Sequence, residues 1–336
     1  MENSSYSQIL IEPALNGATT LVIVTGYSNP QMILRHMDEL NSLDLSVDID
    51  LLVGMTGVDG MSLTTLSAFQ SIPSTRGRVN LNCRFTVDNH SVHSKVYLWK
   101  DAGSELLAWV GSANYTQNGF GLNHRSHTHH EFMTQIEPRI ASGYINALHV
   151  PTVDYGDQEI KSRLRLYERE LQPKRRYIIR AETEFEPQIQ IENESSSSVL
   201  LPLVMTRGEQ AGQVHTRAGL NWGQREGRNP SQAYIPVPQS IASTGFFPER
   251  GYYFQLSTDD GQAFIATVAQ DGNKAIETPS DNSLLGKYFR SRLGVPEDSF
   301  VSIEDLQKYG STAVRISKLS DDEYQLDFAP GINYPR

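Results

Sequence analysis

The residues of this sequence that are best suited to chemistry lie between positions 91 and 120. His93 and Lys95 are two residues apart in the run SVHSKVYLWK, and Gly-Ser-x-Asn follows at 111–114, at the end of the next predicted strand. Side chains alternate between the faces of a strand, so we expect His93 and Lys95 on one face, with apolar neighbours on the other. An H-x-K sequence alone occurs by chance in roughly half of chains this long, whereas the combination at this spacing occurs in about one in a thousand.

This set of side chains suits the cleavage of a phosphodiester without a metal ion. A neutral His93 can attack phosphorus in line and form a covalent phosphohistidine. Lys95, Ser112 and Asn114 can donate hydrogen bonds to the non-bridging oxygens, on which charge develops. We therefore expect no cofactor. The alternative is a β-hairpin that carries a surface histidine and lysine beside an ordinary Gly-Ser turn.

The same residues resemble the signature of the phospholipase D superfamily, which is His-x-Lys, four residues, Asp, and then Gly-Ser-x-Asn. The position of the signature Asp holds Lys100, with Asp101 one place late. Some nuclease members of the superfamily also lack this acid, so the departure favours a nuclease. The match covers His93, Lys95, Gly111, Ser112 and Asn114.

The resemblance also implies an acid on a later strand that orients the histidine. Glu131, in the run HHEFMTQI, is the candidate, and strand alternation would turn Phe132 toward the core. A plain exposed glutamate is the alternative. The nearby histidines invite a zinc interpretation, but no cysteine or acid completes four ligands, so we expect a polar loop and no metal. These histidines are His124, His127, His129 and His130.

The motif occurs once, although superfamily members use two histidines, one to attack and one to protonate the leaving oxygen. His215, in the run HTR, has neither the lysine nor the downstream Gly-Ser. A single motif predicts a homodimer through the catalytic domain, with the active site across its two-fold axis. A general acid of another type is the alternative.

Composition and charge limit the class of protein. Of the 336 residues, 38% are hydrophobic and 20% are charged, values typical of globular proteins. Cys83 is the only cysteine, so an intrachain disulfide is excluded, and the N-terminus lacks the features of a secretory signal. We expect a cytoplasmic protein without a membrane partner. The net charge of −10 argues against a polyanionic partner unless basic residues cluster locally, as they do at 173–180 and 216–228.

The pattern of predicted elements divides the chain. Residues 1–172 alternate strands and helices before a run of strands, which predicts an α/β domain with a mixed sheet flanked by helices. A charged helix is expected at 157–170. Residues 181–198 are acidic and then serine-rich, so we expect a linker or connector at 173–198. Residues 199–336 show short strands separated by turns and two short helices, typical of a mainly β barrel or sandwich.

Two polar loops of the second half gather side chains that can read base edges or hold phosphates. A surface loop whose tryptophan packs against the barrel is the alternative for the first. The first loop, within 217–238, supplies Arg217, Asn221, Trp222, Gln224, Arg225, Arg228 and Asn229. The second, within 269–283, supplies Gln270, Asp271, Asn273, Lys274, Thr278 and Asn282.

Two polar arms on a small barrel resemble the DNA-binding pseudobarrel of plant auxin-response-type transcription factors. Joined to a phospholipase-D-like nuclease, the arrangement resembles restriction endonucleases of the NgoFVII and BfiI type, most closely in the stretch at 219–238. That resemblance implies sequence-specific, metal-independent cleavage of double-stranded DNA by a homodimer. Some relatives act with a separate ATP-dependent helicase-like subunit, and this chain has no phosphate-binding G-x-x-x-x-G-K-[ST] of its own.

Two other functions stay open at this point. A phospholipid-processing phosphodiesterase belongs to the same superfamily, although neither a membrane-facing amphipathic segment nor a second motif supports it. A non-catalytic DNA-binding protein would use the first domain only for dimerisation.

Overall fold

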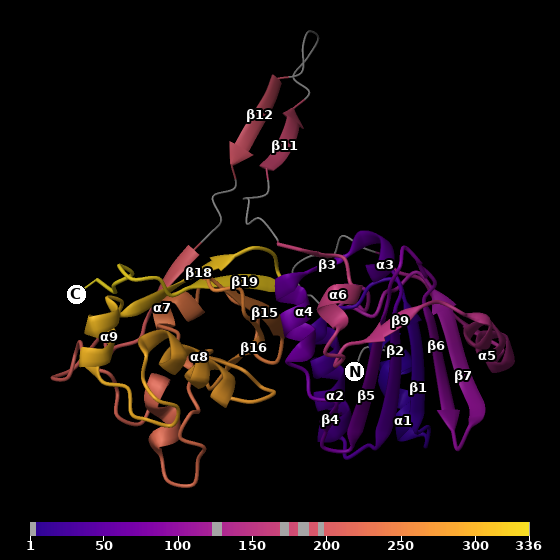
Figure 1. The fold of residues 1–336 in the computed structure, drawn as a ribbon, viewed down its shortest axis with the longest axis horizontal. Coiled ribbons are helices and arrows are strands. Elements are labelled where there is room, and N and C mark those ends of the chain that lie inside the picture. The colour runs from indigo at the N-terminus through magenta and orange to yellow at the C-terminus, as the bar shows by residue number, and fades with distance from the viewer. Residues whose placement is uncertain (1–4, 123–129, 169–174, 181–187, 194–197, 336) are drawn as a thin grey trace. The chain divides into compact units, whose positions relative to one another are not determined.

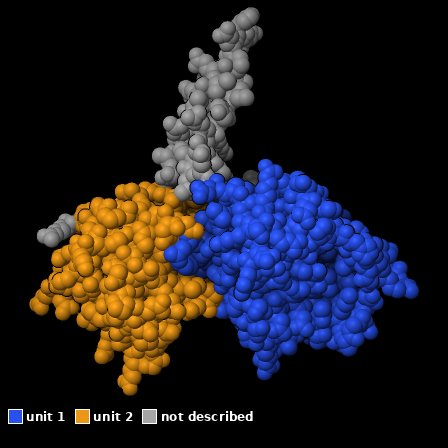
Figure 2. Space-filling view, viewed as in Figure 1, with its two compact units in different colours: residues 1–168, 262–265 blue, residues 169–261, 266–336 orange. Residues whose placement is uncertain are grey.

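The chain forms two compact units in the computed structural model, which describes residues 5–122, 130–168, 175–180, 188–193 and 198–335 (Figure 1). The segments 175–180 and 188–193 are described by their backbone alone. One unit contains residues 1–168 with 262–265, and the other contains 169–261 with 266–336, as Figure 2 shows. The first is built on a mixed sheet with helices and the second is mainly β, so the predicted fold classes are confirmed.

The first unit is organised by an eight-stranded mixed sheet in the order β4-β5-β2-β1-β6-β7-β8, with β9 paired to β5. The pairs β1–β2 and β2–β5 are parallel, and the others are antiparallel. The strands are β1 (Thr20–Thr25), β2 (Val47–Val53), β4 (Thr75–Arg76), β5 (Val79–Thr86), β6 (Val96–Asp101), β7 (Ser104–Gly111), β8 (Met133–Ile136) and β9 (Thr152–Asp154).

The helices of this unit begin where the sequence supplies caps. Asn29 accepts a hydrogen bond from the Met32 amide, and Pro30 takes the first position of α2, as predicted. Ser62 caps α4 in the same way. The helices are η1 (Ser7–Ile11), α1 (Glu12–Leu15), α2 (Pro30–Ser42), α3 (Thr56–Asp59), α4 (Leu63–Gln70), α5 (Pro138–Ala147) and α6 (Ile160–Arg163).

The charged helix predicted at 157–170 is wrong. Among the described residues 157–168 only α6 is helical, and Leu164 is already extended. The chain then pairs β10 (Leu166–Tyr167) with β3 (Met61–Ser62), and the Met61 amide donates to the Arg165 carbonyl. Pairing with a distant strand has overridden the local preference for a helix.

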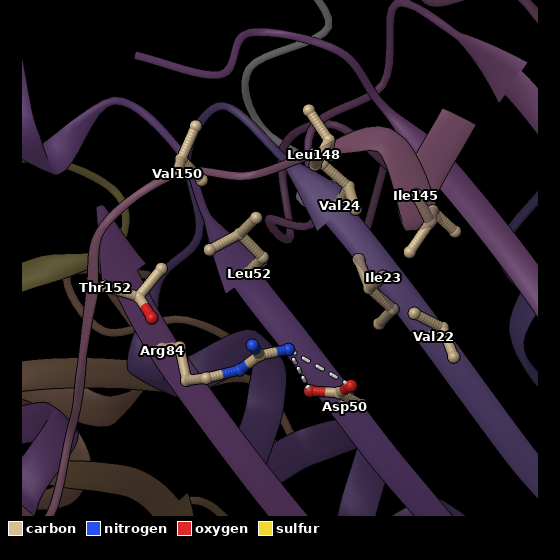
Figure 3. A pocket seen from close by; sticks show the side chains of 10 residues that line it. All are labelled: Val22, Ile23, Val24, Asp50, Leu52, Arg84, Ile145, Leu148, Val150 and Thr152. Carbon is tan, nitrogen blue, oxygen red and sulfur yellow. Dashed lines mark hydrogen bonds and ion pairs between the residues drawn. The ribbon is translucent and has the colours of Figure 1, made fainter. Parts of the chain in front are cut away.

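Both faces of the sheet are buried over the middle strands. On one face, α5 and the chain after it cover a cluster that includes Val24, Leu52, Leu98 and Ala108. The alternate residues of the same strands are buried on the other side. Figure 3 shows a pocket on the first face, where Arg84 pairs with Asp50 at 2.9 Å. It is lined by Val22, Ile23, Val24, Asp50, Leu52, Arg84, Ile145, Leu148, Val150 and Thr152.

The second unit is a seven-stranded sheet in the order β13-β18-β19-β15-β16-β17-β14, in which β15 and β19 are parallel. The two end strands, β13 and β14, contact each other, so the sheet is nearly closed into a barrel. The strands are β13 (Ser198–Pro202), β14 (Ile235–Pro236), β15 (Tyr253–Thr258), β16 (Ala263–Ala269), β17 (Ala275–Glu277), β18 (Ala313–Lys318) and β19 (Glu323–Asp327). Two further strands, β11 (Arg175–Arg180) and β12 (Gln188–Asn193), pair only with each other.

Helix α9 of the second unit begins and ends where the sequence predicts. Ser302 caps α9 in a reciprocal pair with Asp305, and Gly310 stops it with a left-handed φ of 90°. The helices are η2 (Gly219–Gln224), α7 (Gln239–Ala242), α8 (Ser283–Leu293) and α9 (Ile303–Tyr309). Each helix in the described part of the chain is too short or too polar to cross a lipid bilayer.

Candidate active site

The topology of the first sheet brings the motif residues to one edge. The parallel strands β1 and β2 both end there, and the antiparallel partner β6 begins there, because Val24 pairs with Val96. Strand β7 then ends at the same edge and β8 begins there. The segments that meet are therefore those after β1, before β6, after β7 and before β8.

The sequence pattern predicted that His93 and Lys95 lie on a strand, and this is wrong. Both residues lie in a loop before β6. The Val92 amide donates to the Gly54 carbonyl at 2.7 Å, which ties this loop to the end of β2. The contact replaces ladder pairing, so strand alternation does not govern these residues. His93 is exposed, whereas Lys95 is 7% exposed.

The ammonium group of Lys95 is buried against its own motif. Its Nζ donates to the His93 carbonyl at 2.6 Å. Burial lowers the pKa of Lys95, and the carboxylate of Glu131 opposes that shift. An ammonium has three hydrogens. Two of the ammonium hydrogens of Lys95 are therefore available to donate to an anion.

The amide of Asn114 has a defined orientation. Its Oδ1 accepts from the Tyr27 amide at 3.1 Å and lies 3.3 Å from the Thr25 hydroxyl. Its Nδ2 makes no hydrogen bond to any residue that the structure describes. Asn114 therefore offers a donor to a ligand rather than an acceptor.

The imidazole of His93 packs against the segment after β1. The ring of Tyr27 meets it edge-to-face at 5.8 Å between centroids. A Cβ on Gly26 would lie 2.5 Å from His93 Cδ2, so any other residue at position 26 would displace the ring. Sequence analysis missed this segment, although its place at the end of the first predicted strand could have indicated it.

Glu131 contacts Ser112 rather than His93. The Ser112 hydroxyl donates to the Glu131 carboxylate and accepts from the Phe132 amide at 3.0 Å. The hydroxyl hydrogen is thus engaged, and in the described part of the chain Glu131 makes no hydrogen bond to His93. The expectation that Phe132 faces the core is wrong, because it precedes the edge strand β8 and is 72% exposed.

The position of the missing superfamily acid lies far from this edge. Lys100 and Asp101 end β6, which runs away from His93. Lys100 pairs with Thr20 at the start of β1, and the Thr19 hydroxyl donates to Asp101 at 3.0 Å. A lysine at this position therefore leaves the groups around His93 unchanged.

The structure gathers no metal ligands where it is described. Within residues that the structure covers, no three His, Cys, Asp or Glu side chains are placed to hold a metal ion. His130 is exposed, and His124, His127 and His129 lie outside the described residues. The pocket of Figure 3 contains none of the motif residues.

Comparison with known protein families covers both units. Residues 3–162 match the NgoFVII restriction endonuclease N-terminal PLD domain, and residues 192–320 match the NgoFVII C-terminal B3-like DNA-binding domain. The chain belongs to the NgoFVII family of restriction endonucleases. The recognition made from the sequence is confirmed, and DNA is a partner of this NgoFVII-type enzyme.

Other comparisons add little. No curated protein matches the chain. Among solved structures, polyphosphate kinase from Porphyromonas gingivalis is similar over 41% of this chain and 18% of its own, with 12% identity and a TM-score of 0.27. The present chain thus spans less than a fifth of that kinase, and the likeness supports no conclusion about function.

The predicted DNA-contacting residues of this NgoFVII-type enzyme differ in exposure. The exposed ones are Arg217, Arg225, Arg228, Asn229, Asp271 and Lys274. The half-buried ones are Trp222, Gln224, Gln270, Asn273 and Asn282. Asn221 and Thr278 are fully buried.

The exposed arginines of the first loop are held in place. The Arg228 guanidinium lies 4.0 Å from the centroid of the Trp222 ring, which meets Tyr234 edge-to-face. Arg225 Nε donates to the Arg217 carbonyl at 2.8 Å. Trp222 therefore packs within the unit and supports an arginine, and the cationic ends of this loop remain exposed.

Asn221 and Thr278 support the loops from inside. Asn221 Nδ2 donates to the Val301 carbonyl at 2.8 Å, and its Oδ1 accepts from the Val301 amide at 2.9 Å. The Thr278 hydroxyl donates to the Asp281 carbonyl at 2.7 Å. These bonds use the groups that would read a base, so we leave both residues out of the DNA-contacting set.

One residue that holds the first loop was missed from sequence. Arg290, on α8, is completely buried. Its guanidinium donates to the carbonyls of Leu220 and Pro230 at 3.3 Å, and its Nε donates to the Ser299 carbonyl at 2.8 Å. An arginine on an amphipathic helix normally faces solvent, so the sequence held no signal for this role.

Proposed function

We propose that this restriction endonuclease cuts double-stranded DNA at a specific sequence, without a metal ion, through a phosphohistidine on His93. The observation that carries the proposal is the meeting of three groups at one sheet edge. They are the exposed His93 ring, the Lys95 ammonium and the Asn114 amide, whose Nδ2 makes no hydrogen bond to the described residues. A nucleophile beside two fixed donors suits phosphoryl transfer.

The reaction takes place in two displacements. A neutral nitrogen of His93 attacks phosphorus, the bond from phosphorus to the leaving oxygen breaks, and a second histidine gives that oxygen a proton. Water then gives a proton to the second histidine and attacks the phosphohistidine; the P–N bond breaks, which releases a 5′ or 3′ phosphate end and restores both imidazoles. Lys95 and Asn114 hold the non-bridging oxygens in both steps. Glu131 keeps Ser112 in place.

The second histidine is His93 of the partner subunit in this proposal. The chain contains one H-x-K followed by Gly-Ser-x-Asn, so a pair of such histidines requires two copies. A two-fold axis beside the motif edge would place the copies face to face. The cytoplasmic location and the homodimer predicted from sequence belong to this proposal.

Cleavage in excess EDTA tests the proposal directly. Wild type, His93→Ala and the exposed control His149→Ala are incubated with mixed-sequence DNA at equal protein concentration. We expect discrete fragments from wild type and from His149→Ala, and none from His93→Ala. Equal cutting by His93→Ala, or a strict need for Mg²⁺, would contradict the mechanism.

A trapping experiment identifies the intermediate. DNA labelled at the scissile phosphate is mixed with wild type and quenched in alkali, in which a phosphoramidate bond survives. Label on wild type that is released by acid and missing from His93→Ala supports the phosphohistidine. If wild type binds DNA but cuts only when a candidate ATPase subunit and ATP are added, the chain is the nuclease subunit of an ATP-dependent system.

A further inference from the structure

We infer that the segment Thr25-Gly26-Tyr27, a turn that begins at the last residue of β1, is the positioning element of the active site. It orients the amide of Asn114 and holds the ring of His93. The inference rests on the proposed roles of His93 and Asn114 and adds residues that the motif does not contain. None of the three turn residues needs to touch the DNA.

Thr25 connects the turn to the segment that carries Asn114. It is completely buried, and its Oγ1 accepts from the Tyr115 amide at 3.0 Å. The same Oγ1 lies 2.9 Å from the Tyr27 carbonyl and 3.3 Å from Asn114 Oδ1. A hydroxyl has one hydrogen, so it donates to one of these acceptors at a time. Valine would fill the same space without any of these bonds.

The Tyr27 amide decides which way the Asn114 amide faces. A backbone N–H can only donate, and it meets Asn114 Oδ1 at 3.1 Å. A flipped amide would place its NH₂ against this donor and lose the bond. The turn therefore keeps Nδ2 on the side of the amide away from the Tyr27 N–H, where it can donate to a phosphate oxygen.

The other side of the turn limits the movement of the His93 ring. Gly26 allows the ring to lie against the backbone, since a Cβ there would be 2.5 Å from Cδ2. The Tyr27 ring packs edge-to-face against the His93 ring, with 5.8 Å between the ring centroids, and forms a wall beside it. The Tyr27 hydroxyl donates to Asp59 at 2.6 Å, which anchors the far end of that wall to α3.

Single-turnover kinetics of Thr25→Val tests the inference, since a misplaced catalytic group loses rate rather than binding. We expect the cleavage rate, measured well below the unfolding transition, to fall about 10- to 100-fold with DNA affinity unchanged. Loss of the bond to the buried Tyr115 amide should also lower Tm by several degrees. Thr25→Ser, which keeps the hydroxyl, should restore the rate to within about threefold. Thr20→Val, at the other end of β1, is the matched control and should cut as wild type.

A double-mutant cycle separates positioning from a general structural effect. If Thr25 acts through Asn114, then Thr25→Val should cause no further loss of rate in an Asn114→Ala background. The inference is overturned if the double mutant loses rate by the product of the two single-mutant losses, or if Thr25→Val cuts at the wild-type rate. Either result would leave the nuclease mechanism intact.

The tyrosine wall has its own comparison. Tyr27→Leu should lower the single-turnover rate more than Tyr27→Phe, which keeps the ring but loses the bond to Asp59. Tyr167→Phe, at an exposed tyrosine, is the control. Equal rates for Tyr27→Leu and wild type would remove Tyr27 from the element. In every arm His93→Ala is run alongside, and cutting by that variant would contradict the proposed function itself.

Discussion

Lys95 shows how a single buried charge can set the working pH of the site. Burial lowers its pKa from the ordinary 10.5, and Glu131 opposes the shift. If the charged form holds the phosphate, the cleavage rate should fall with rising pH before an exposed lysine would lose its proton. Glu131→Gln removes the opposing charge, so the alkaline limb of its pH–rate profile should move to lower pH.

The measurement is the single-turnover rate across the alkaline range for wild type and Glu131→Gln. Glu137→Gln changes an exposed carboxylate that pairs with Arg139 and should leave the limb in place. A limb that moves to higher pH in Glu131→Gln would exclude Lys95 as the titrating group.

His36 makes the stability of the first unit depend on pH. Its ring bonds the Tyr115 hydroxyl and the Leu10 carbonyl, and burial lowers its pKa from 6.5 to about 4. Below pH 6.5 His36 is protonated in the unfolded chain, whereas in the folded chain it stays neutral down to about pH 4. The free energy of unfolding therefore falls as the pH falls through this window. We expect this residue to lower the free energy of unfolding by roughly 2 kcal/mol between pH 7 and pH 5.

Urea unfolding at the two pH values, followed by tryptophan fluorescence, measures the effect. Trp99 and Trp109 lie in this unit and report on it. The comparison is with His36→Gln, which cannot titrate and should lose less stability between pH 7 and pH 5 than wild type. An equal loss in both proteins would show that other groups carry the pH dependence.

Much of the site could be anticipated residue by residue from spacing, but contacts across the fold could not. His93, Lys95 and Asn114 lie at one sheet edge because H-x-K and Gly-Ser-x-Asn flank a hairpin of ordinary length. The partner of Glu131 was not foreseeable, because Ser112 meets it only once β8 has paired with β7. Phe132 was placed wrongly because alternation was applied before a strand that begins one residue later.

At the scale of elements, α8 holds the first polar loop, within 217–238, through Arg290. Several buried carbonyls depend on this guanidinium. Arg290→Met would leave them without donors, and we expect a loss of about 3 kcal/mol in the stability of the second unit. The loop should loosen at the same time, so affinity for cognate DNA should fall.

Thermal unfolding and DNA binding of Arg290→Met test this expectation. Arg315→Met replaces an exposed arginine of β18 and should change stability little. If Arg290→Met is as stable as that control, the buried carbonyls find other donors and the helix does not anchor the loop.

Elements with strong local signals were predicted well. The caps at Asn29 and Ser302 and the stop at Gly310 are where the sequence indicated them. Helix α5 was not predicted, because Gly143 and the β-branched Ile140 and Ile145 lower its helix propensity. Packing against the sheet stabilises the helix in the folded protein. The charged segment at 157–170 failed for the opposite reason, since pairing with β3 removed a helix that its own residues favour.

At the scale of the whole molecule, the proposed shared site makes activity depend on both copies. If each site needs two intact His93 residues, mixed dimers with one His93→Ala subunit are inactive. After subunit exchange at equal amounts, activity should drop to about one quarter of the all-wild-type value, because random pairing leaves that share of intact dimers.

Cleavage rates at constant total protein across mixing ratios give the answer. A quadratic fall with the wild-type fraction supports the shared site, whereas a linear fall would show that each copy works alone. His149→Ala in place of His93→Ala should leave the rate unchanged at every ratio.

The burial of Asn221 has a consequence for anyone who wishes to redirect the enzyme to a new target sequence. Its amide is fully committed to Val301 and also reaches the His215 carbonyl. In a library that randomises the whole loop, every clone that replaces Asn221 would therefore lose these bonds, and its loop would misfold. One restricted to the exposed positions Arg217 and Arg225 would vary the outer surface and would keep Asn229, whose Oδ1 accepts from the Ser231 amide.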